Sequence, residues 1–285
     1  MLTRIDRVQV VVSDRAAAAT RFARLLDAAV VCEDRIRLLG ACRTVLRLGS
    51  SEVELLEPDG AGVTNDFLSA THGGLFAAGF ATPDIERLRA RFADRGIAYT
   101  EESGQLFLAP QALGVPGLRA VVSGSAELPA NGLVQHLYEA TLLARDLAPA
   151  VRDAALGFGL DASHFVPIRS DEFGYEGVLM LFQPDRLDRM EVITPNDSAK
   201  TIGRFFAKRG ASWYMCFAQA ADLRPIRHRL LEHAPHDWTG PREGIPGHLF
   251  IHPQALGGMM LGLSRTTYAW TWSGHPERVC AAGEQ

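Results

Sequence analysis

The chain has 285 residues, of which 47% are hydrophobic and 22% charged, and its formal net charge is −4. This is the composition of an ordinary globular protein, which excludes a largely disordered chain. Lys and Arg are scattered along the sequence, so no basic stripe indicates nucleic-acid binding.

The chain also lacks the sequence features of an exported or membrane protein. Its apolar runs are too short to span a bilayer, and the first residues lack the long apolar segment of a signal peptide. The cysteines form no CxxC pair, which favours reduced thiols over a disulfide framework or a zinc site. We therefore expect a soluble cytoplasmic protein. The four cysteines are Cys32, Cys42, Cys216 and Cys280.

A pattern of strand, helix and further strands recurs along the chain. Each occurrence opens with an eight-residue apolar or alternating run that is typical of a half-buried strand. Each run ends in Asp, which is expected to cap the helix that follows it. The runs are RVQVVVSD (7–14), AAGFATPD (77–84), EATLLARD (139–146) and MCFAQAAD (215–222).

The remaining elements follow each run in the same order. Helical patterns cover residues 16–26, 85–96, 147–159 and 223–234. Two strand candidates then follow each helix, at 43–49 with 51–58, 106–110 with 118–123, 177–182 with 189–195, and 248–253 with 259–264. Polar stretches rich in turn-forming residues are interpreted as linkers; they are 58–69, 123–132 and 194–203.

An internal duplication explains the recurrence. GQLFLAPQALG (104–114) and GHLFIHPQALG (247–257) are identical at eight of eleven positions, at an offset of 143 residues. Fixed-offset similarity of this kind is the signature of a repeated structural unit. The sequence therefore predicts two duplicated halves, and both copies of this segment should form the same strand and turn. The four units cover approximately residues 1–60, 70–125, 133–198 and 208–270.

Four short segments resemble the vicinal oxygen chelate superfamily, which includes the glyoxalase, bleomycin-resistance and extradiol-dioxygenase folds. They are IDRVQVVVSD with VELLEPDG, and RMEVITP with LFIHPQALGG. The resemblance covers nearly the whole chain. It implies an α+β fold of four βαβββ modules, paired into two similar domains at 1–127 and 128–285, each with sheets that curl around a ligand cup. Because the superfamily contains isomerases, lyases, dioxygenases and binding proteins, it leaves the reaction open.

The resemblance also implies where a divalent metal would bind, with a His on the first strand and a Glu on the last strand of a module. In the first half, Arg7 and Ala77 stand at the His positions, while Glu54 and a position near Ala120 stand at the Glu positions. We expect no metal there and a structural role for this domain. Glu54 is expected to form an ion pair with Arg7 across neighbouring strands.

In the second half, Glu139 and Glu191 occupy the corresponding positions of the third module, whereas Met215 and Gly262 occupy those of the fourth. The two-His, one-Glu set is absent, which disfavours an extradiol dioxygenase with the usual iron site. Two carboxylates in one cup would raise each other's pKa and could provide an acid and a base near neutral pH. The alternative is that one Glu is salt-bridged or faces solvent.

Two histidines distinguish the second copy of the repeated segment. His248 and His252 stand where the first copy has Gln105 and Ala109. Side chains four residues apart on an extended strand face the same side, and histidine can act as acid, base or ligand near neutrality. At least one of the two is a candidate site residue; the alternative is a surface pair beside a strand.

These observations lead to one hypothesis and two alternatives. The first is an isomerase, epimerase or lyase that acts on a small oxygenated substrate in the C-terminal cup, with Glu139 and Glu191 as catalytic residues assisted by His248 or His252. The first alternative is a metal-dependent, dioxygenase-like enzyme with one divalent ion bound by Glu139, Glu191 and His248. The second is a non-catalytic ligand-binding or resistance protein. The partner expected is a small molecule, with neither nucleic acid nor membrane.

An aromatic stripe near the end of the chain bears on the oligomeric state. Tyr268, Trp270 and Trp272 alternate, which on an extended strand would place them on one face. We interpret the stripe as core packing. A ligand mouth or the surface of a homodimer are the alternatives.

Overall fold

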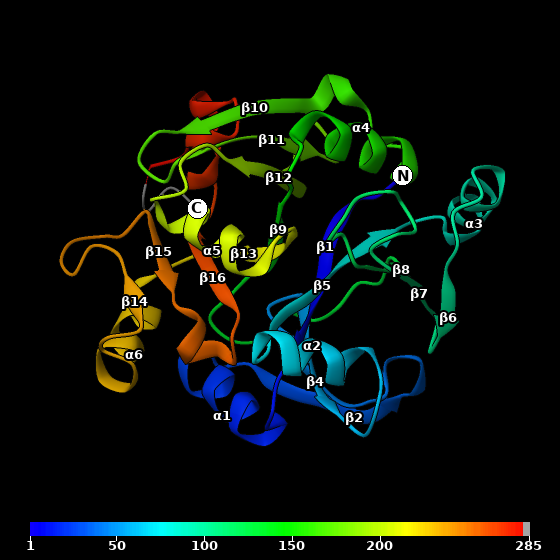
Figure 1. The fold of residues 1–285 in the computed structure, drawn as a ribbon. Helices are drawn as coiled ribbons and strands as arrows, with labels where there is room; N and C mark the ends of the chain where they lie inside the picture. Colours follow the sequence, from blue (N-terminus) through cyan, green and yellow to red (C-terminus); the bar gives the residue numbers. More distant parts are fainter. Residues whose placement is uncertain (282–285) are drawn as a thin grey trace. The chain divides into compact units, whose positions relative to one another are not determined.

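The computed structural model describes residues 1–281, and its strands form two eight-stranded sheets (Figure 1). The order in the first sheet is β2-β3-β4-β1-β5-β8-β7-β6, and that in the second is β10-β11-β12-β9-β13-β16-β15-β14. The two orders are equivalent, element for element, as expected for a duplicated chain. With six α-helices described beside the sheets, the predicted α+β class is confirmed.

The first sheet contains β1 (Arg4–Val11), β2 (Ala29–Ile36), β3 (Ala41–Leu48), β4 (Ser51–Pro58), β5 (Gly74–Thr82), β6 (Thr100–Glu102), β7 (Gln105–Leu108) and β8 (Ala120–Gly124). The second contains β9 (His136–Leu143), β10 (Phe165–Ser170), β11 (Tyr175–Leu181), β12 (Arg189–Pro195), β13 (Ser212–Ala220), β14 (Trp238–Thr239), β15 (His248–Ile251) and β16 (Met260–Arg265). The α-helices are α1 (Arg15–Leu26), α2 (Val63–Thr71), α3 (Ile85–Asp94), α4 (Leu147–Phe158), α5 (Thr201–Arg209) and α6 (Arg224–His233). Short 3-10 helices are η1 (Arg37–Leu39), η2 (Ala162–His164), η3 (Pro253–Leu256), η4 (Tyr268–Trp272) and η5 (Pro276–Arg278).

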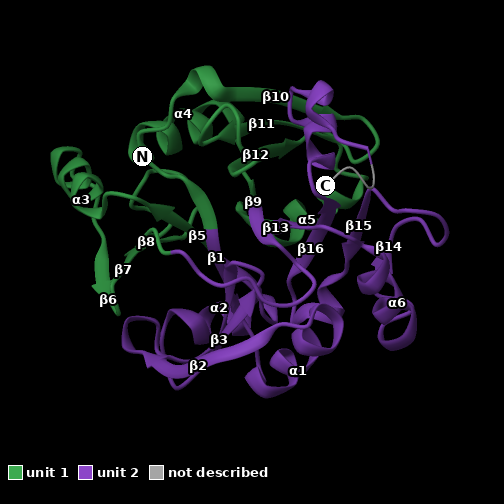
Figure 2. Cartoon of the chain, turned by 180° about the vertical axis from the view of Figure 1, so that it is seen from behind, with its two compact units in different colours: residues 1–5, 77–126, 139–214 green, residues 6–76, 127–138, 215–285 purple. Residues whose placement is uncertain are grey.

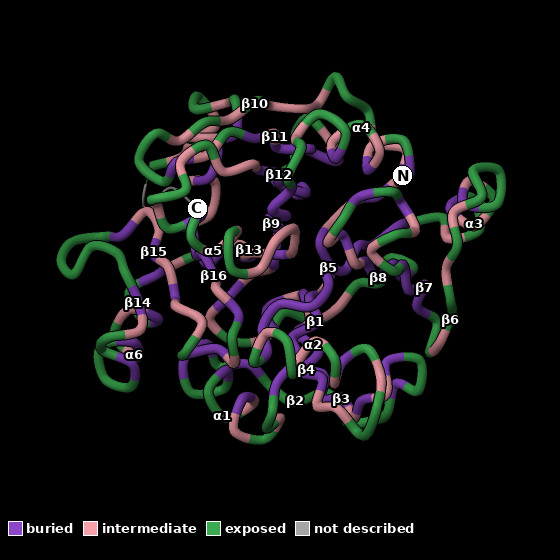
Figure 3. The backbone as a smooth tube through the Cα atoms, in the orientation of Figure 1, coloured by how far each residue is buried: buried purple, intermediate pink, exposed green. Residues whose placement is uncertain are grey.

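In each of the four modules the first strand pairs in parallel with the last. These pairs are β1 with β4, β5 with β8, β9 with β12, and β13 with β16. Strands β5 and β9 are buried along almost their whole length, as the tube in Figure 3 shows. The pairing places first-strand and last-strand side chains next to each other, which is the arrangement that the candidate site requires.

The helix starts confirm two of the predicted caps and correct two. The side chain of Asp14 accepts from the backbone N–H of Ala17, and that of Asp84 accepts from Arg87. Asp146 is at the N-cap of α4 but makes no side-chain capping bond. The N-cap of α6 is Leu223, one residue past the predicted Asp222, although the side chain of Asp222 accepts from the backbone N–H of Arg224 in the first turn.

Three other sequence-based assignments are wrong or incomplete. Helices α2 and α5 lie mostly within or just beyond two stretches that were predicted to be linkers, 58–69 and 194–203. The strand directly after each module's helix, such as β2 or β10, is implied by the βαβββ pattern but was not located in the sequence. Residues 268–272 form η4 instead of an extended strand, because Thr267 takes a left-handed conformation (φ 65°) and turns the chain at the end of β16.

The duplicated segment behaves as predicted in its strand part. β7 and β15 each occupy the seventh place in the order of their sheet. β7 pairs antiparallel with β8, and β15 pairs antiparallel with β16. After the strand, residues 110–113 form a turn, while 253–256 form η3. Both segments therefore have equivalent places in the two halves.

The chain divides into two compact units, which Figure 2 shows in different colours. Unit 1 comprises Met1–Ile5, Ala77–Ala126 and Glu139–Tyr214. Unit 2 comprises Asp6–Phe76, Glu127–Tyr138 and Met215–Gln285, of which residues up to 281 are described. Each unit thus combines most of one module from the first half with most of one from the second. A domain boundary near residue 127 stays a prediction.

An aromatic core stabilises unit 1. The ring of Phe80, on β5, lies 5.3 Å from that of Phe158, 5.9 Å from that of Phe182 and 6.4 Å from that of Trp213. Its side chain is completely buried. We expect Phe80→Ala to lower the free energy of unfolding by about 3–5 kcal/mol, because it removes buried apolar area and leaves a cavity. Urea denaturation measures this, with the exposed Phe173→Ala as control; a loss below about 1 kcal/mol would contradict the packing described.

Two further observations concern the predicted environment of the protein. None of the helices in the described part of the chain combines the length and apolar character needed to cross a membrane. All four cysteines are free thiols, as the sequence predicted.

Candidate active site

The two predicted carboxylates lie on neighbouring strands of unit 1. In the parallel pair β9 and β12, Arg189 is opposite Glu139 and Glu191 is opposite Thr141. Glu139 is 1% exposed and Glu191 7% exposed. Thr141 Oγ1 lies 2.5 Å from Glu191 Oε2 and 3.3 Å from Glu139 Oε1. One threonine hydroxyl is therefore within hydrogen-bonding distance of both carboxyl groups.

Arg189 is the member of this site that the sequence analysis missed. Its Nε donates to Glu139 Oε2 at 2.6 Å, and both side chains are almost fully buried. Nη1 of Arg189 also donates to the carbonyl oxygen of Leu187, which fixes the guanidinium. The sequence analysis left open that one of the two glutamates is salt-bridged, and Glu139 is. A signal existed: Arg189 is two residues before Glu191, and alternate residues of a strand share a face.

The environment of Glu191 raises its pKa well above the usual value for a carboxyl group. Burial is the largest cause, and the nearby charge of Glu139 is the second. The hydrogen bond from Thr141 and the charge of Arg189 oppose this shift without cancelling it. The site thus pairs Glu139, which is bound by a guanidinium, with Glu191, whose raised pKa favours the protonated form.

Helix α5, which begins in a stretch predicted to be a linker, packs against β12 beside the two carboxyl groups. Leu143 lies on the same face of β9 as Glu139, and Ile193 on the same face of β12 as Glu191. Both pack with Ile202 of α5 in one apolar cluster. Tyr175 and Tyr214 are partly buried members of that cluster. Burial raises the pKa of both tyrosines, and the charge of Glu191 raises it further. An apolar wall with two protonated phenols therefore adjoins the carboxyl groups.

The equivalent strands of unit 2 carry a related but more strongly charged cluster. Arg7 on β1 is opposite Glu52 on β4. At the equivalent positions of the other sheet, Glu139 on β9 is opposite Arg189 on β12. Both sheets therefore have an ion pair here, with the acidic and basic residues on exchanged strands. Arg7 Nη1 lies 3.3 Å from Glu52 and 2.9 Å from Glu54, which confirms the predicted ion pair of Arg7 with Glu54. Arg43 donates to Glu54 at 3.0 Å. Glu54 is thus held as an anion by two guanidiniums, unlike Glu191.

The two candidate histidines both belong to unit 2. The His248 ring stacks on Tyr268 with a centroid distance of 5.9 Å and contacts the edges of Phe250 and Trp272. Burial lowers the pKa of His248, which favours the neutral imidazole. His252 follows the end of β15 and is the N-cap of η3, so the two are not on one continuous strand as expected. Their participation in the site stays a prediction.

The side chains offered as metal ligands do not form a metal site within the described part of the chain. There, no group of three or more His, Cys, Asp and Glu side chains is arranged to hold a metal ion. The carboxylate of Glu139 is engaged by Arg189, and His248 is packed among aromatic rings. Because this donor set does not fit a metal, no step of the proposed reaction is assigned to one.

The strand order and the four parallel first-to-last strand pairs define the vicinal oxygen chelate fold, and the comparison with solved structures confirms it. A triple mutant of 4-hydroxymandelate synthase from Streptomyces coelicolor is similar over 93% of this chain and 93% of its own, with a TM-score of 0.69 and 11% identity. A xylose isomerase-like TIM barrel/4-hydroxyphenylpyruvate dioxygenase fusion protein is similar over 93% of this chain and 49% of its own, with a TM-score of 0.61 and 13% identity. No family model matches the sequence, and no curated protein matches it. At these identities the likeness establishes the fold alone.

A third buried carboxyl group lies next to the site in the sequence. Asp188, directly before Arg189, is 4% exposed and accepts from the backbone N–H of Ile5 at 3.3 Å. Burial raises its pKa to about 7, against the opposing charge of Arg186. The folded chain therefore keeps a proton on Asp188 at pH values where the unfolded chain, with a pKa of 3.8, has lost it. The resulting stabilisation is complete below the unfolded value and is lost as the pH rises through about 7.

Asp188→Asn is expected to remove this pH dependence. The amide can still accept from Ile5 but carries no proton to lose, so the variant should be more stable than the native chain above pH 7, and the difference should shrink as the pH falls. Urea denaturation between about pH 5 and 9 measures it. Asp185→Asn, an exposed position of the same loop, is the control. Identical pH profiles for the native chain and Asp188→Asn would contradict the prediction.

Proposed function

We propose that the chain is an enzyme that moves a proton at a carbon next to a carbonyl group of a small oxygenated substrate, as isomerases, epimerases and lyases do. The observation that carries the proposal is the pair of buried carboxyl groups in different environments. Glu139 is bound to Arg189 at 2.6 Å, while the pKa of Glu191 is raised by burial and by Glu139. Environments that separate two pKa values assign an acid and a base.

In this reaction Glu139 is the base and Glu191 the acid. The Glu139 carboxylate accepts the proton from the substrate carbon. The Glu191 carboxylic acid donates a hydrogen bond, and then its proton, to the carbonyl oxygen on which negative charge develops. Thr141, within reach of both, can pass a proton between them as the groups return to their starting states. Arg189 supplies the opposite charge that a buried carboxylate such as Glu139 requires.

The proposal for His248 is separate, since this residue belongs to unit 2. A neutral imidazole among aromatic rings could assist proton transfer or orient a flat substrate. The same cluster favours the alternative of stoichiometric ligand binding, because aromatic side chains provide the apolar surface typical of small-molecule sites. Its rings are His248, Phe250, Tyr268 and Trp272.

Deuterium exchange tests the proposal and does not require the reaction product to be identified. The protein is incubated in D2O with a panel of carbonyl acids and esters that each have one acidic C–H bond, and NMR follows loss of that proton signal. We expect exchange of at least one compound by the native chain and none by Glu191→Gln. Glu54→Gln, the equivalent change in unit 2, should retain exchange per folded molecule.

Two outcomes would contradict an acid/base enzyme. Exchange that persists in Glu191→Gln would remove Glu191 from the reaction. Tight binding of a panel compound at one molar equivalent, without exchange, would favour the binding protein instead. Metal analysis of the purified chain addresses the dioxygenase-like alternative.

A further inference from the structure

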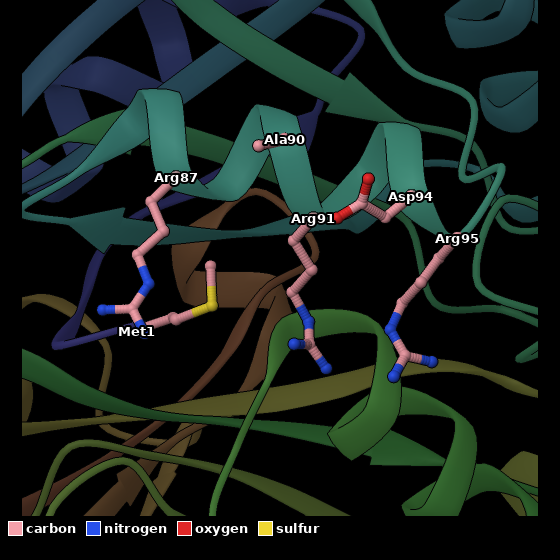
Figure 4. Close-up of a pocket in the computed structure, with 6 residues that line it drawn as sticks. All are labelled: Met1, Arg87, Ala90, Arg91, Asp94 and Arg95. Atoms are coloured by element: carbon pink, nitrogen blue, oxygen red, sulfur yellow. The ribbon is translucent and has the colours of Figure 1, made fainter.

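A hollow on the surface of unit 1 gathers three arginines on one side of α3. It has a volume of about 730 Å³ and is lined by Met1, Arg87, Ala90, Arg91, Asp94 and Arg95 (Figure 4). We infer that this hollow binds a small phosphorylated molecule and that the arginines hold its phosphate groups. The inference goes beyond the proposed proton transfer, because none of these residues belongs to the carboxylate site.

The helix places the three guanidiniums in one row. Arg87 and Arg91 belong to α3 and Arg95 is its C-cap, and their spacing of four residues places them on the same side of the helix at intervals of about 6 Å along its axis. Leu88 and Phe92, each one position further along, are completely buried and fix the rotation of the helix against the core. Figure 4 shows all three side chains extending from the same side of α3. Such a row can contact successive phosphates of a diphosphate or triphosphate.

Arg91 is already oriented by the protein. Its Nε donates to the carbonyl oxygen of Gly157 at 3.0 Å, and its Nη2 donates to that of Leu156 at 2.5 Å, both at the C-terminal end of α4. A guanidinium held in this way loses less side-chain entropy when a ligand binds. Arg87 and Arg95, which flank it, are exposed and can close on a ligand from both sides.

The positive charge of the row is not neutralised by carboxylates. Within the described residues, none of the three guanidiniums has a carboxylate oxygen within 4.0 Å, whereas Arg89 on the same helix is paired with Glu86 and Glu101. Burial and the charges of Arg95 and Arg87 lower the pKa of Arg91, which is the expected result of cations close together. Asp94 is the one acidic residue lining the hollow.

The chemistry favours phosphate over other anions. The planar guanidinium donates two parallel hydrogen bonds to phosphate oxygens, and a row of three matches a linear polyphosphate better than a single carboxylate. The volume of the hollow lies in the range of sites for small ligands, roughly 300–1,000 Å³. A nucleotide or another organic diphosphate therefore fits the size as well as the charge.

Calorimetric titration with inorganic tripolyphosphate and, separately, ADP tests the inference. We expect both to bind the native chain, and Arg87→Gln and Arg95→Gln each to weaken binding about tenfold, the usual worth of a charged hydrogen bond. Asp94→Asn should strengthen binding, since it removes the repelling charge. Arg89→Gln is the matched control on the same helix and should leave the affinity unchanged. Thermal melting confirms that each variant is folded.

The inference is wrong if tripolyphosphate fails to bind, or if Arg89→Gln weakens binding as much as Arg87→Gln, since that would indicate only general attraction to a basic helix. An oligoglutamate peptide serves as a competing probe. If it binds more tightly than tripolyphosphate and ADP and shows the same loss in the variants, the row is a contact for acidic protein segments instead.

Discussion

Replacing Glu191 by glutamine is expected to reduce turnover by about 10²–10⁴-fold, the usual contribution of a positioned proton donor, while the melting temperature stays level or rises. The amide has nearly the shape of the carboxylic acid and can still accept from Thr141. It cannot donate a proton to a developing oxyanion with the strength of an acid. It also removes the repulsion by Glu139 that raises the pKa of Glu191.

Turnover separates catalysis from a purely structural pair, and the melting temperature shows that the variant is folded. If the carboxyl groups only share a proton in the core, the glutamine variant should be neutral or stabilising and turnover should be unchanged. Full activity of both Glu139→Gln and Glu191→Gln would therefore remove the catalytic role. The ratio kcat/KM on the substrate found by deuterium exchange, together with the melting temperature, measures both quantities.

Glu54→Gln is the matched control for stability, and it should give the opposite result. Its carboxylate accepts from Arg7, Arg43 and the side-chain amide of Gln9. Neutralising Glu54 leaves two buried guanidiniums with less compensation, which typically costs about 3–5 kcal/mol. Two Glu→Gln changes at equivalent positions of the two halves should thus shift the melting temperature in different directions.

The fold was largely predictable because its signals are local and repeated. The alternating run, the terminal Asp and the helical period occur four times, and the segment 104–114 recurs at 247–257 with eight identities. The pairing of first and last strands followed from the resemblance and placed Glu139 near Glu191 correctly. These features depend on residue order within one module, which a single sequence displays.

The electrostatic state of the site was not predictable in the same way. The apolar cluster that contains Ile193, two residues after Glu191, includes Ile202 of α5, and that helix begins in a polar stretch that resembles a linker. The partner of Glu139 depends on the register of β9 with β12, which places Arg189, and not Glu191, directly opposite it. The aromatic residues 268–272 alternate as in a strand, but the left-handed Thr267 before them starts a 3-10 helix.

Replacing Arg189 by methionine is expected to destabilise the chain by about 3–5 kcal/mol, because it leaves the buried Glu139 without its cation. Arg189 is fully buried and Glu139 nearly so, and the bond between them is 2.6 Å long. The second change Glu139→Gln should restore most of the lost stability, since a neutral pair of similar volume has no charge to compensate. Urea denaturation of the single and double variants gives the coupling energy between the two residues.

The same pair of changes distinguishes positioning from catalysis. Arg189→Met should also reduce turnover, because the buried Glu139 loses the guanidinium that binds its carboxylate. The double variant with Glu139→Gln should stay inactive despite its restored stability. Recovery of activity in the double variant would show that Glu139 serves only the fold, and the base would have to be sought elsewhere in the protein.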